Sequence, residues 1–262
     1  MIWGAIEKSA KTLIFKPHVM IPMLIVSIVT YLLTDFSASL LENFVTDIFL
    51  YGEIIAEFDP FLYMIGTYPM EITLLILGGI VALFVSVVAF ISISKFCDGE
   101  SFVESVNSSI MEWKRNIGLV IFGAVVFFLF FVIWNIAMFI INFIDTALSG
   151  VLGPLLYYII VPIVTIILIA IFAVKLSFVL PAFAKGDNLR EAIRKSWELT
   201  NDSFWNALIF IVILLIITFI IAQIFLFLAL AIVALDLVFL IIGEIISTTF
   251  LALGISYYYY LR

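Results

Sequence analysis

The chain of 262 residues contains one cysteine, Cys97, and one histidine, His18. A single cysteine excludes an internal disulfide and a cysteine metal cluster, and a single histidine excludes a site built from several histidines. A metal site made only of carboxylates stays open, but no pattern in the sequence supports one. Because no catalytic or cofactor-binding motif is found, we expect neither enzymatic activity nor a cofactor.

Charge is also scarce, since charged residues make up 12% of the chain against roughly 25% in an average soluble domain. Hydrophobic residues make up 66% of the sequence, and the mean hydropathy is +1.33. Lipid must therefore solvate most of the surface, and nucleic acid is not expected as a partner. The apolar runs are continuous and do not alternate as barrel strands do, which predicts an all-α membrane protein.

Basic residues are missing from most of the connections between these runs. They gather at the N-terminus, in two internal segments and at the last position: Lys8, Lys11, Lys16, Lys95, Lys114, Arg115, Lys175, Lys185, Arg190, Arg194, Lys195 and Arg262. Since cytoplasmic loops carry an excess of Lys and Arg, all twelve can lie on the cytoplasmic side. This predicts a multi-pass protein with both termini in the cytoplasm.

Stretches of about twenty apolar residues predict a bundle of six membrane spans, at 18–34, 70–94, 117–142, 154–178, 205–230 and 234–257. The last two spans are separated by a turn that we place at Asp236. Without that turn the count becomes five, and the C-terminus moves to the outer side. The acidic outer connection 35–69 carries apolar residues at helical spacing and is expected to form a helix in the outer interface.

An internal repeat emerges when the two large cytoplasmic connections are aligned. Residues 99–106 match 186–193 position by position, and each copy contains a helix-capping pair, Ser101 with Glu104 and Asn188 with Glu191. The N-terminal segment 2–13 shows the same pattern of small and apolar positions. We therefore expect a single integral membrane domain, 1–262, built from three units at about 1–94, 95–178 and 179–262. Each unit would be an amphipathic cytoplasmic helix followed by two spans.

The third cytoplasmic helix is the first candidate site. Its polar face carries Arg190, Arg194 and Lys195, and Trp197 favours the headgroup boundary. One interpretation is a structural elbow packed under the bundle. The other is a docking surface for a cytoplasmic protein.

In this region the sequence resembles a known family. Leu180-Pro181-Ala182, the stretch from Ala192 to Thr200, and Phe204-Trp205 are similar to the signature of a poorly characterised group of prokaryotic membrane proteins. That group includes the membrane domain attached to some glycerophosphodiester phosphodiesterases and related stand-alone six-span proteins. The resemblance covers about 175–206 and implies a location in a prokaryotic cell membrane. The soluble domain that carries hydrolysis in the fused relatives is not found in this sequence, so no catalytic residue is transferred.

Glu244 is the second candidate site, because it falls near the middle of the last predicted span. A lipid-facing ionised carboxylate there would be strongly disfavoured, so Glu244 must face protein or water, or be protonated. Asn135, Asn142 and Gln223 are candidate polar neighbours. The carboxyl group is either a proton or cation site or a residue that serves helix packing. The run Tyr257–Tyr260 is expected to belong to an interfacial aromatic belt.

Two functions remain open from the sequence. The first is a non-enzymatic membrane protein that conducts, transports or binds a small solute, a cation or a lipid within the helical bundle. The second is a membrane scaffold or assembly factor that holds a cytoplasmic partner through its amphipathic helices. A lipid-modifying enzyme is third, since no convergent acids, bases or metal ligands support it.

Overall fold

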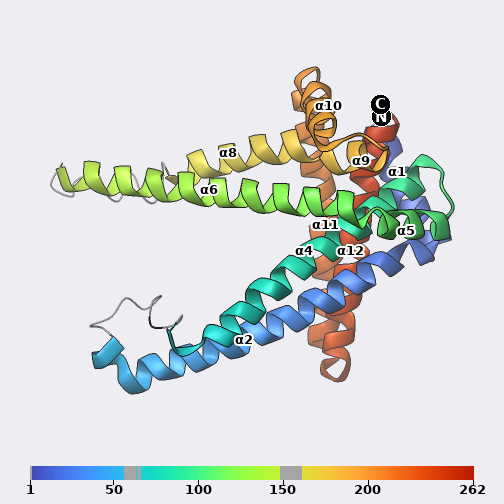
Figure 1. Ribbon diagram of the computed structural model, residues 1–262. Helices are drawn as coiled ribbons and strands as arrows, with labels where there is room; N and C mark the ends of the chain where they lie inside the picture. The colour runs from blue at the N-terminus through green and yellow to red at the C-terminus, as the bar shows by residue number, and fades with distance from the viewer. Residues whose placement is uncertain (1, 56–62, 64–65, 148–160) are drawn as a thin grey trace.

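The computed structural model describes residues 2–55, 63, 66–147 and 161–262, and every regular element in these ranges is a helix (Figure 1). The first element group is α1 (Ile2–Phe15), η1 (Pro17–Met20), α2 (Ile21–Ile55) and α4 (Pro69–Asp98). The second is α5 (Phe102–Met111), α6 (Trp113–Ala147), α8 (Val161–Leu176) and α9 (Val179–Ala184). The third is α10 (Leu189–Asn201), α11 (Phe204–Ala231), η3 (Val233–Leu235) and α12 (Asp236–Tyr260). The prediction of an all-α fold is confirmed.

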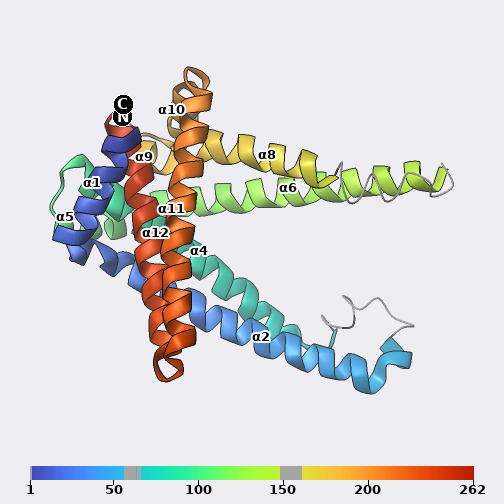
Figure 2. The same cartoon turned by 180° about the vertical axis from the view of Figure 1, so that it is seen from behind.

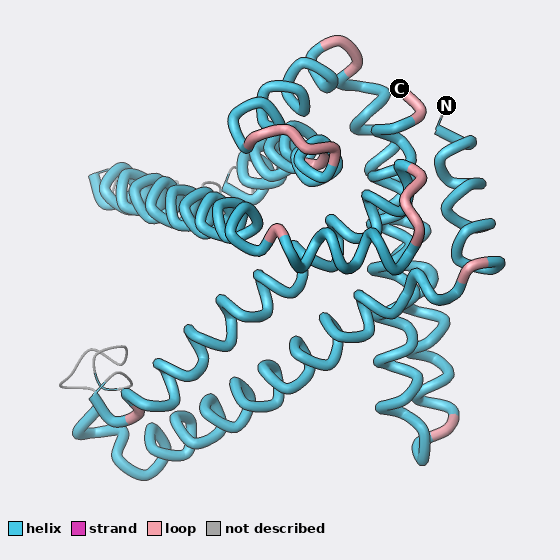
Figure 3. The backbone as a smooth tube through the Cα atoms, turned by 45° about the vertical axis from the view of Figure 1, so that its right-hand side comes forward, coloured by secondary structure: helices cyan, strands magenta, loops and turns pink. Residues whose placement is uncertain are grey.

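The long helices form three arms that diverge from one region, which we call the hub. The arms are α2 with α4, α6 with α8, and α11 with α12 (Figures 1 and 2). The hub consists of the short helices α1, α5, α9 and α10 and the adjoining ends of the long helices. The arms spread from the hub and do not close into the single bundle expected from the sequence (Figure 3). Away from the hub, most large apolar side chains on the described arms are exposed, as lipid contact requires.

Five of the described helical stretches are long and apolar enough to cross a membrane. They are Pro17–Asp47, Pro69–Asp98, Ile163–Ala184, Phe204–Ala231 and Val233–Tyr260. The predicted third span, 117–142, lies in α6, many of whose side chains are outside the described residues, as is the start of the fourth span. The third span, and with it the count of six, therefore stays a prediction. The last two spans are separate helices, because η3 interrupts the chain just before Asp236.

The predicted outer helix is not a separate element. The α-helix that begins at Ile21 continues through Ile55 without a break, so the first part of connection 35–69 extends the first span. The hydroxyl groups of Thr34 and Thr46 each donate a hydrogen bond to a backbone carbonyl of the same helix, at 2.9 and 2.8 Å. Neither residue therefore interrupts the helix.

The short helices begin where the capping pairs predicted. In α5 the Ser101 hydroxyl accepts from the amide of Glu104, and the Glu104 carboxylate accepts from the amide of Ser101. The Ser101 hydroxyl also donates to this carboxylate at 2.7 Å, and this bond, followed by the one from the Ser101 amide, lowers the pKa of the Glu104 carboxyl group. In α10 only half of the expected pair is found among the described residues, since Asn188 accepts from the amide of Glu191 at 2.9 Å. Gly99 and Gly186 have φ values of 112° and 101°, which glycine adopts without strain.

The three short helices α1, α5 and α10 bury small residues at equivalent positions inside the hub. The first aligned position holds Ala5, Ser105 and Ala192, and the second holds Ser9, Ser109 and Ser196; all six are fully buried. The Ser9 and Ser109 hydroxyls donate within their own helices, whereas the Ser196 hydroxyl donates to the carbonyl of Lys175 at 2.6 Å. The element order, one short helix and then two long ones, occurs three times. The repeat as such stays a prediction.

Candidate functional site

The tyrosine run at the end of α12 lies at the centre of the hub. Tyr258 is fully buried and stacks between Phe210 and Phe178, with ring centroids 4.1 and 5.4 Å away. The Tyr257 hydroxyl shares a hydrogen bond of 2.8 Å with Thr12 in α1. The Tyr260 hydroxyl donates to the carbonyl of Pro181 in α9 at 3.3 Å. The expectation of an interfacial belt is therefore wrong for Tyr258, which is fully buried, and stays a prediction for the other three tyrosines. Consecutive helical positions point in different directions, and these reach different helices.

One pocket opens beside Tyr258, between α1, α11 and α12. We call it the membrane-side pocket; it has a volume of about 460 Å³ and is lined by Ile2, Trp3, Asn206, Ile209, Ile213, Tyr258 and Arg262. The Tyr258 hydroxyl is buried and has no hydrogen-bond partner within the described ranges. Arg262 lines the same pocket. The pocket thus combines apolar walls with a few polar groups at one end.

A second pocket lies between the end of α12 and the helices α9 and α10. We call it the polar pocket; its volume is about 320 Å³, and its lining includes Lys185, Lys195, Glu198, Asp202, Tyr259, Tyr260 and Arg262. Lys195 Nζ donates to Asp187 Oδ1 at 2.6 Å, and this bond raises the pKa of the Lys195 ammonium. Arg262 donates to the carbonyl oxygen of Leu199. Because Arg262 lines both pockets, they lie on either side of this residue.

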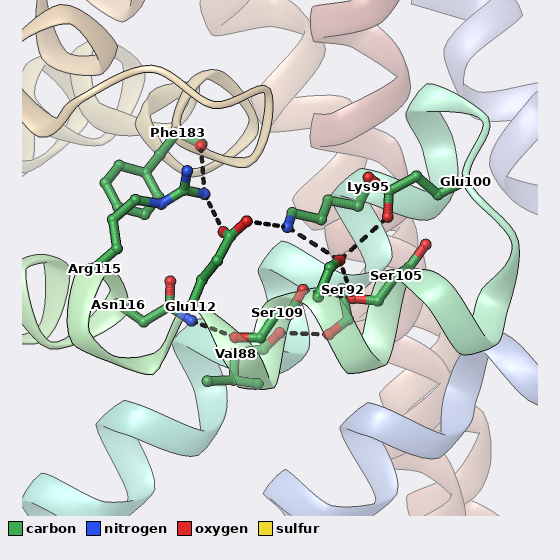
Figure 4. Close-up of polar contacts among 11 residues, drawn as sticks. Val88, Ser92, Lys95, Glu100, Ser105, Ser109, Glu112, Arg115, Asn116 and Phe183 are labelled. Carbon is green, nitrogen blue, oxygen red and sulfur yellow. Dashed lines mark hydrogen bonds and ion pairs between the residues drawn. The ribbon is translucent and has the colours of Figure 1, made fainter.

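A charged network ties α5 and α6 to α4 and α9 (Figure 4). Lys95, whose side chain is 6% exposed, donates to Glu112 Oε1 at 3.0 Å and to the Ser108 hydroxyl at 3.1 Å. The second carboxylate oxygen of Glu112 lies 2.5 Å from Arg115, which also donates to the carbonyl of Phe183 at 3.2 Å. The network therefore fixes the start of the α6–α8 arm relative to the α2–α4 arm.

The candidate residues of α10 do not converge. Arg190 and Arg194 are exposed, and Arg194 lies 3.7 Å from Glu198 in a pair of solvated side chains. Lys195 turns toward Asp187 and lines the polar pocket. Trp197 is 42% exposed, and the Lys175 ammonium lies 4.9 Å from the centre of its ring. Of the four, Lys195 lines one of the two hub pockets described above, and the other three line neither.

Glu244 lies on the α12 side of the last arm and is half-buried. Its carboxylate makes no hydrogen bond or ion pair with any residue that the structure describes. Gly243 packs against Phe225 of α11, so Gln223 lies at about the same level as Glu244 on the neighbouring helix. The structure brings these two positions to one part of the arm without bonding them.

The other two proposed neighbours of Glu244 belong to α6. The side chains of Asn135 and Asn142 lie outside the described residues. The α6 helix leads away from α12 in both ribbon views (Figures 1 and 2). The divergence of the arms, which the hydropathy pattern does not encode, thus separates α6 from α12 (Figures 1 and 2). The pairing of Asn135 and Asn142 with Glu244 stays a prediction.

The described helices define a multi-pass helical membrane protein. Within that class, residues 153–261 match the family model for the membrane domain of glycerophosphoryl diester phosphodiesterase. The match confirms the resemblance first seen over 175–206 and extends it through α12. No curated protein and no solved structure matches the chain.

Proposed function

We propose that this protein is a non-catalytic integral membrane protein that binds a membrane lipid at the hub. The observation that supports this most is the membrane-side pocket, where Ile209 and Ile213 of an apolar span lead to a buried tyrosine hydroxyl and an arginine. Ligand pockets of several hundred Å³ with apolar walls and a few polar groups are typical small-molecule sites. Of the three ligand classes considered, a solute, a cation and a lipid, a lipid fits best, because it has an apolar part for the isoleucine wall and a polar part for Tyr258 and Arg262.

The buried hydroxyl of Tyr258 gives the ligand a defined anchor. A buried polar group without a hydrogen-bond partner costs about 1–3 kcal/mol. Because Tyr258 is fully buried, a lipid carbonyl or phosphate oxygen would remove that cost only if the side chains that cover the hydroxyl move aside when the lipid binds. Trp3, which is 71% exposed at the same pocket, suits the boundary between headgroups and acyl chains. We infer that the lipid lies with its apolar part along α11 and its polar part toward Arg262.

The proposal includes an orientation. All twelve basic residues belong to the hub or to helix ends that adjoin it, while the outer ends of the arms carry acids such as Asp47, Glu71 and Asp236. The positive-inside rule then puts the hub and both termini in the cytoplasm of a prokaryotic cell, with three like-oriented pairs of spans. The bound lipid would come from the cytoplasmic leaflet.

Filling the membrane-side pocket tests the proposal. We expect Ile213→Trp to lower the amount of lipid that copurifies with the protein about tenfold, because the indole occupies the space of the apolar part of the lipid. The measurement is native mass spectrometry of the protein released from mild detergent. Ile216→Trp is the matched control, since Ile216 is exposed on the same helix and does not line the pocket. Equal retention of lipid by both variants would contradict the proposal.

A second function is favoured by the outer surface of α10. Its buried face is held by Ala192, Ser196 and Thr200, which leaves Arg190 and Arg194 free to face the cytoplasm. A membrane scaffold that docks an acidic cytoplasmic protein would use this surface.

Charge removal on α10 tests the scaffold function. The double variant Arg190→Gln with Arg194→Gln should lose a specific copurifying protein while it unfolds at the same temperature as the wild type. Lys11→Gln provides a control, because Lys11 is an exposed base of the hub on a different helix. Unchanged copurification in the double variant would leave lipid binding as the better account.

Glu244 keeps its place as our predicted intramembrane polar site, with Gln223 as the neighbour at its level. It lies outside the two hub pockets, so lipid binding at the hub does not depend on it.

A further inference from the structure

We propose that the polar pocket receives the headgroup of the same lipid, and that this headgroup is zwitterionic, with a phosphate and a primary ammonium. The inference rests on the proposed function and specifies its ligand. Two observations support it. Arg262 lines both pockets, and the polar pocket is lined by both basic and acidic side chains.

The two pockets are adjacent through the last turn of α12. Tyr258 lines the membrane-side pocket, and the next two residues, Tyr259 and Tyr260, line the polar pocket. Arg262 follows this turn and is held by a hydrogen bond to the carbonyl of Leu199, which itself lines the polar pocket. A lipid whose apolar part lies beside Tyr258 would therefore carry its headgroup past Arg262 into the polar pocket.

Two cations are available for a phosphate. The Lys185 ammonium lies 5.8 Å from the centre of the Tyr260 ring and has no carboxylate partner within the described ranges. Arg262 bonds a neutral carbonyl and retains further donors. Lys195, in contrast, already forms an ion pair with Asp187, with Nζ and Oδ1 2.6 Å apart. We therefore assign the phosphate to Lys185 and Arg262, with Lys195 contributing to the wall of the pocket.

The same pocket supplies carboxylates for an ammonium. Asp202 makes no ion pair with a described residue, and Glu198 has only a long contact of 3.7 Å with Arg194. A purely anionic headgroup would be repelled by these two acids. A headgroup with a phosphate and a primary ammonium complements both charges, and the ammonium can also donate hydrogen bonds to the carboxylates.

The test is lipid competition followed by native mass spectrometry. The protein in mild detergent is given equal amounts of phosphatidylethanolamine and phosphatidylglycerol with identical acyl chains. We expect the wild type to retain the ethanolamine lipid several-fold over the glycerol lipid. Lys185→Gln should lower retention of both lipids about tenfold, the effect of losing one charge-assisted hydrogen bond. Asp202→Asn should abolish the preference and leave retention of the glycerol lipid unchanged or higher.

Controls separate this inference from the proposed function. Lys114→Gln removes an exposed hub lysine outside both pockets and should change neither retention nor preference. Soluble glycerophosphoethanolamine, which has the headgroup without acyl chains, should compete only weakly if the membrane-side pocket supplies affinity. Full competition by this probe would assign the polar pocket to a free phosphodiester and overturn the lipid assignment. Wild-type preference in Asp202→Asn, or wild-type retention of both lipids in Lys185→Gln, would overturn the headgroup inference alone. A wild type that retains no lipid would overturn the proposed function as well.

Discussion

Replacing Gly243 with valine is expected to destabilise the last arm by about 3 kcal/mol, near the upper end of what overpacking costs. A Cβ atom at Gly243 would lie 2.5 Å from the Cβ of Phe225 and 3.1 Å from its Cγ. The Cβ of Phe225 cannot move by a change of rotamer, so α11 and α12 would have to separate. The measurement is the midpoint of thermal unfolding in detergent.

Gly79→Val is the control for this experiment. Gly79 also lies inside a long helix, but a Cβ atom there would meet nothing within 4 Å. The two substitutions share the same change in helix propensity, so the difference between them reports the contact with Phe225. Equal unfolding midpoints for the two variants would mean that α11 and α12 do not pack as closely as the structure has them.

Glu112→Gln is expected to destabilise the hub by about 2–3 kcal/mol, because it leaves Lys95 charged, buried and without an anion. The value is lower than for a fully buried pair, since the Glu112 side chain is 34% exposed. Arg115 loses the same carboxylate, so two cations lose one shared partner. Thermal unfolding of the purified protein provides the measurement.

Two further variants test whether the buried charge of Lys95 causes the loss of stability in Glu112→Gln. Glu7→Gln breaks the exposed pair with Lys11 and should leave the unfolding midpoint unchanged, because solvent screens that pair. Combining Glu112→Gln with Lys95→Met should recover part of the lost stability, since the buried charge is then gone. If the double variant is as unstable as the sum of its single variants, the proposed coupling between Lys95 and Glu112 is refuted.

Hydropathy and capping were sufficient to predict several features of this fold. The described spans coincide with apolar runs because lipid exposure acts on each helix independently of its neighbours. The start of α5 followed from Ser101 and Glu104 because a capping box is a local arrangement within four residues.

The sites at the hub could not be predicted in the same way. The membrane-side pocket combines Trp3 with Asn206 and Tyr258, both of which lie more than two hundred residues after Trp3 in the sequence, and no local pattern indicates such a meeting. The partnership of Lys95 with Glu112 depends on how α5 turns back toward α4. A signal did exist in the tyrosine run, since four consecutive helical positions cannot all face one lipid boundary. Their contacts had to come from the structure.

The angles between the arms could not be predicted from the sequence either. Small residues such as Ser105 and Ala192 allow close approach at the hub, but they do not specify the direction in which the next pair of long helices leaves it. The separation of α6 from α12 (Figures 1 and 2) follows from that direction.

The most direct test of lipid binding at the hub is an experimental structure of the protein in lipid nanodiscs. Our account predicts elongated density in the membrane-side pocket, along Ile209 and Ile213, with its polar end within hydrogen-bond distance of the Tyr258 hydroxyl and beside Arg262. A pocket that is closed by protein side chains in the bilayer, with the Tyr258 hydroxyl bonded to another residue of the chain, would contradict it.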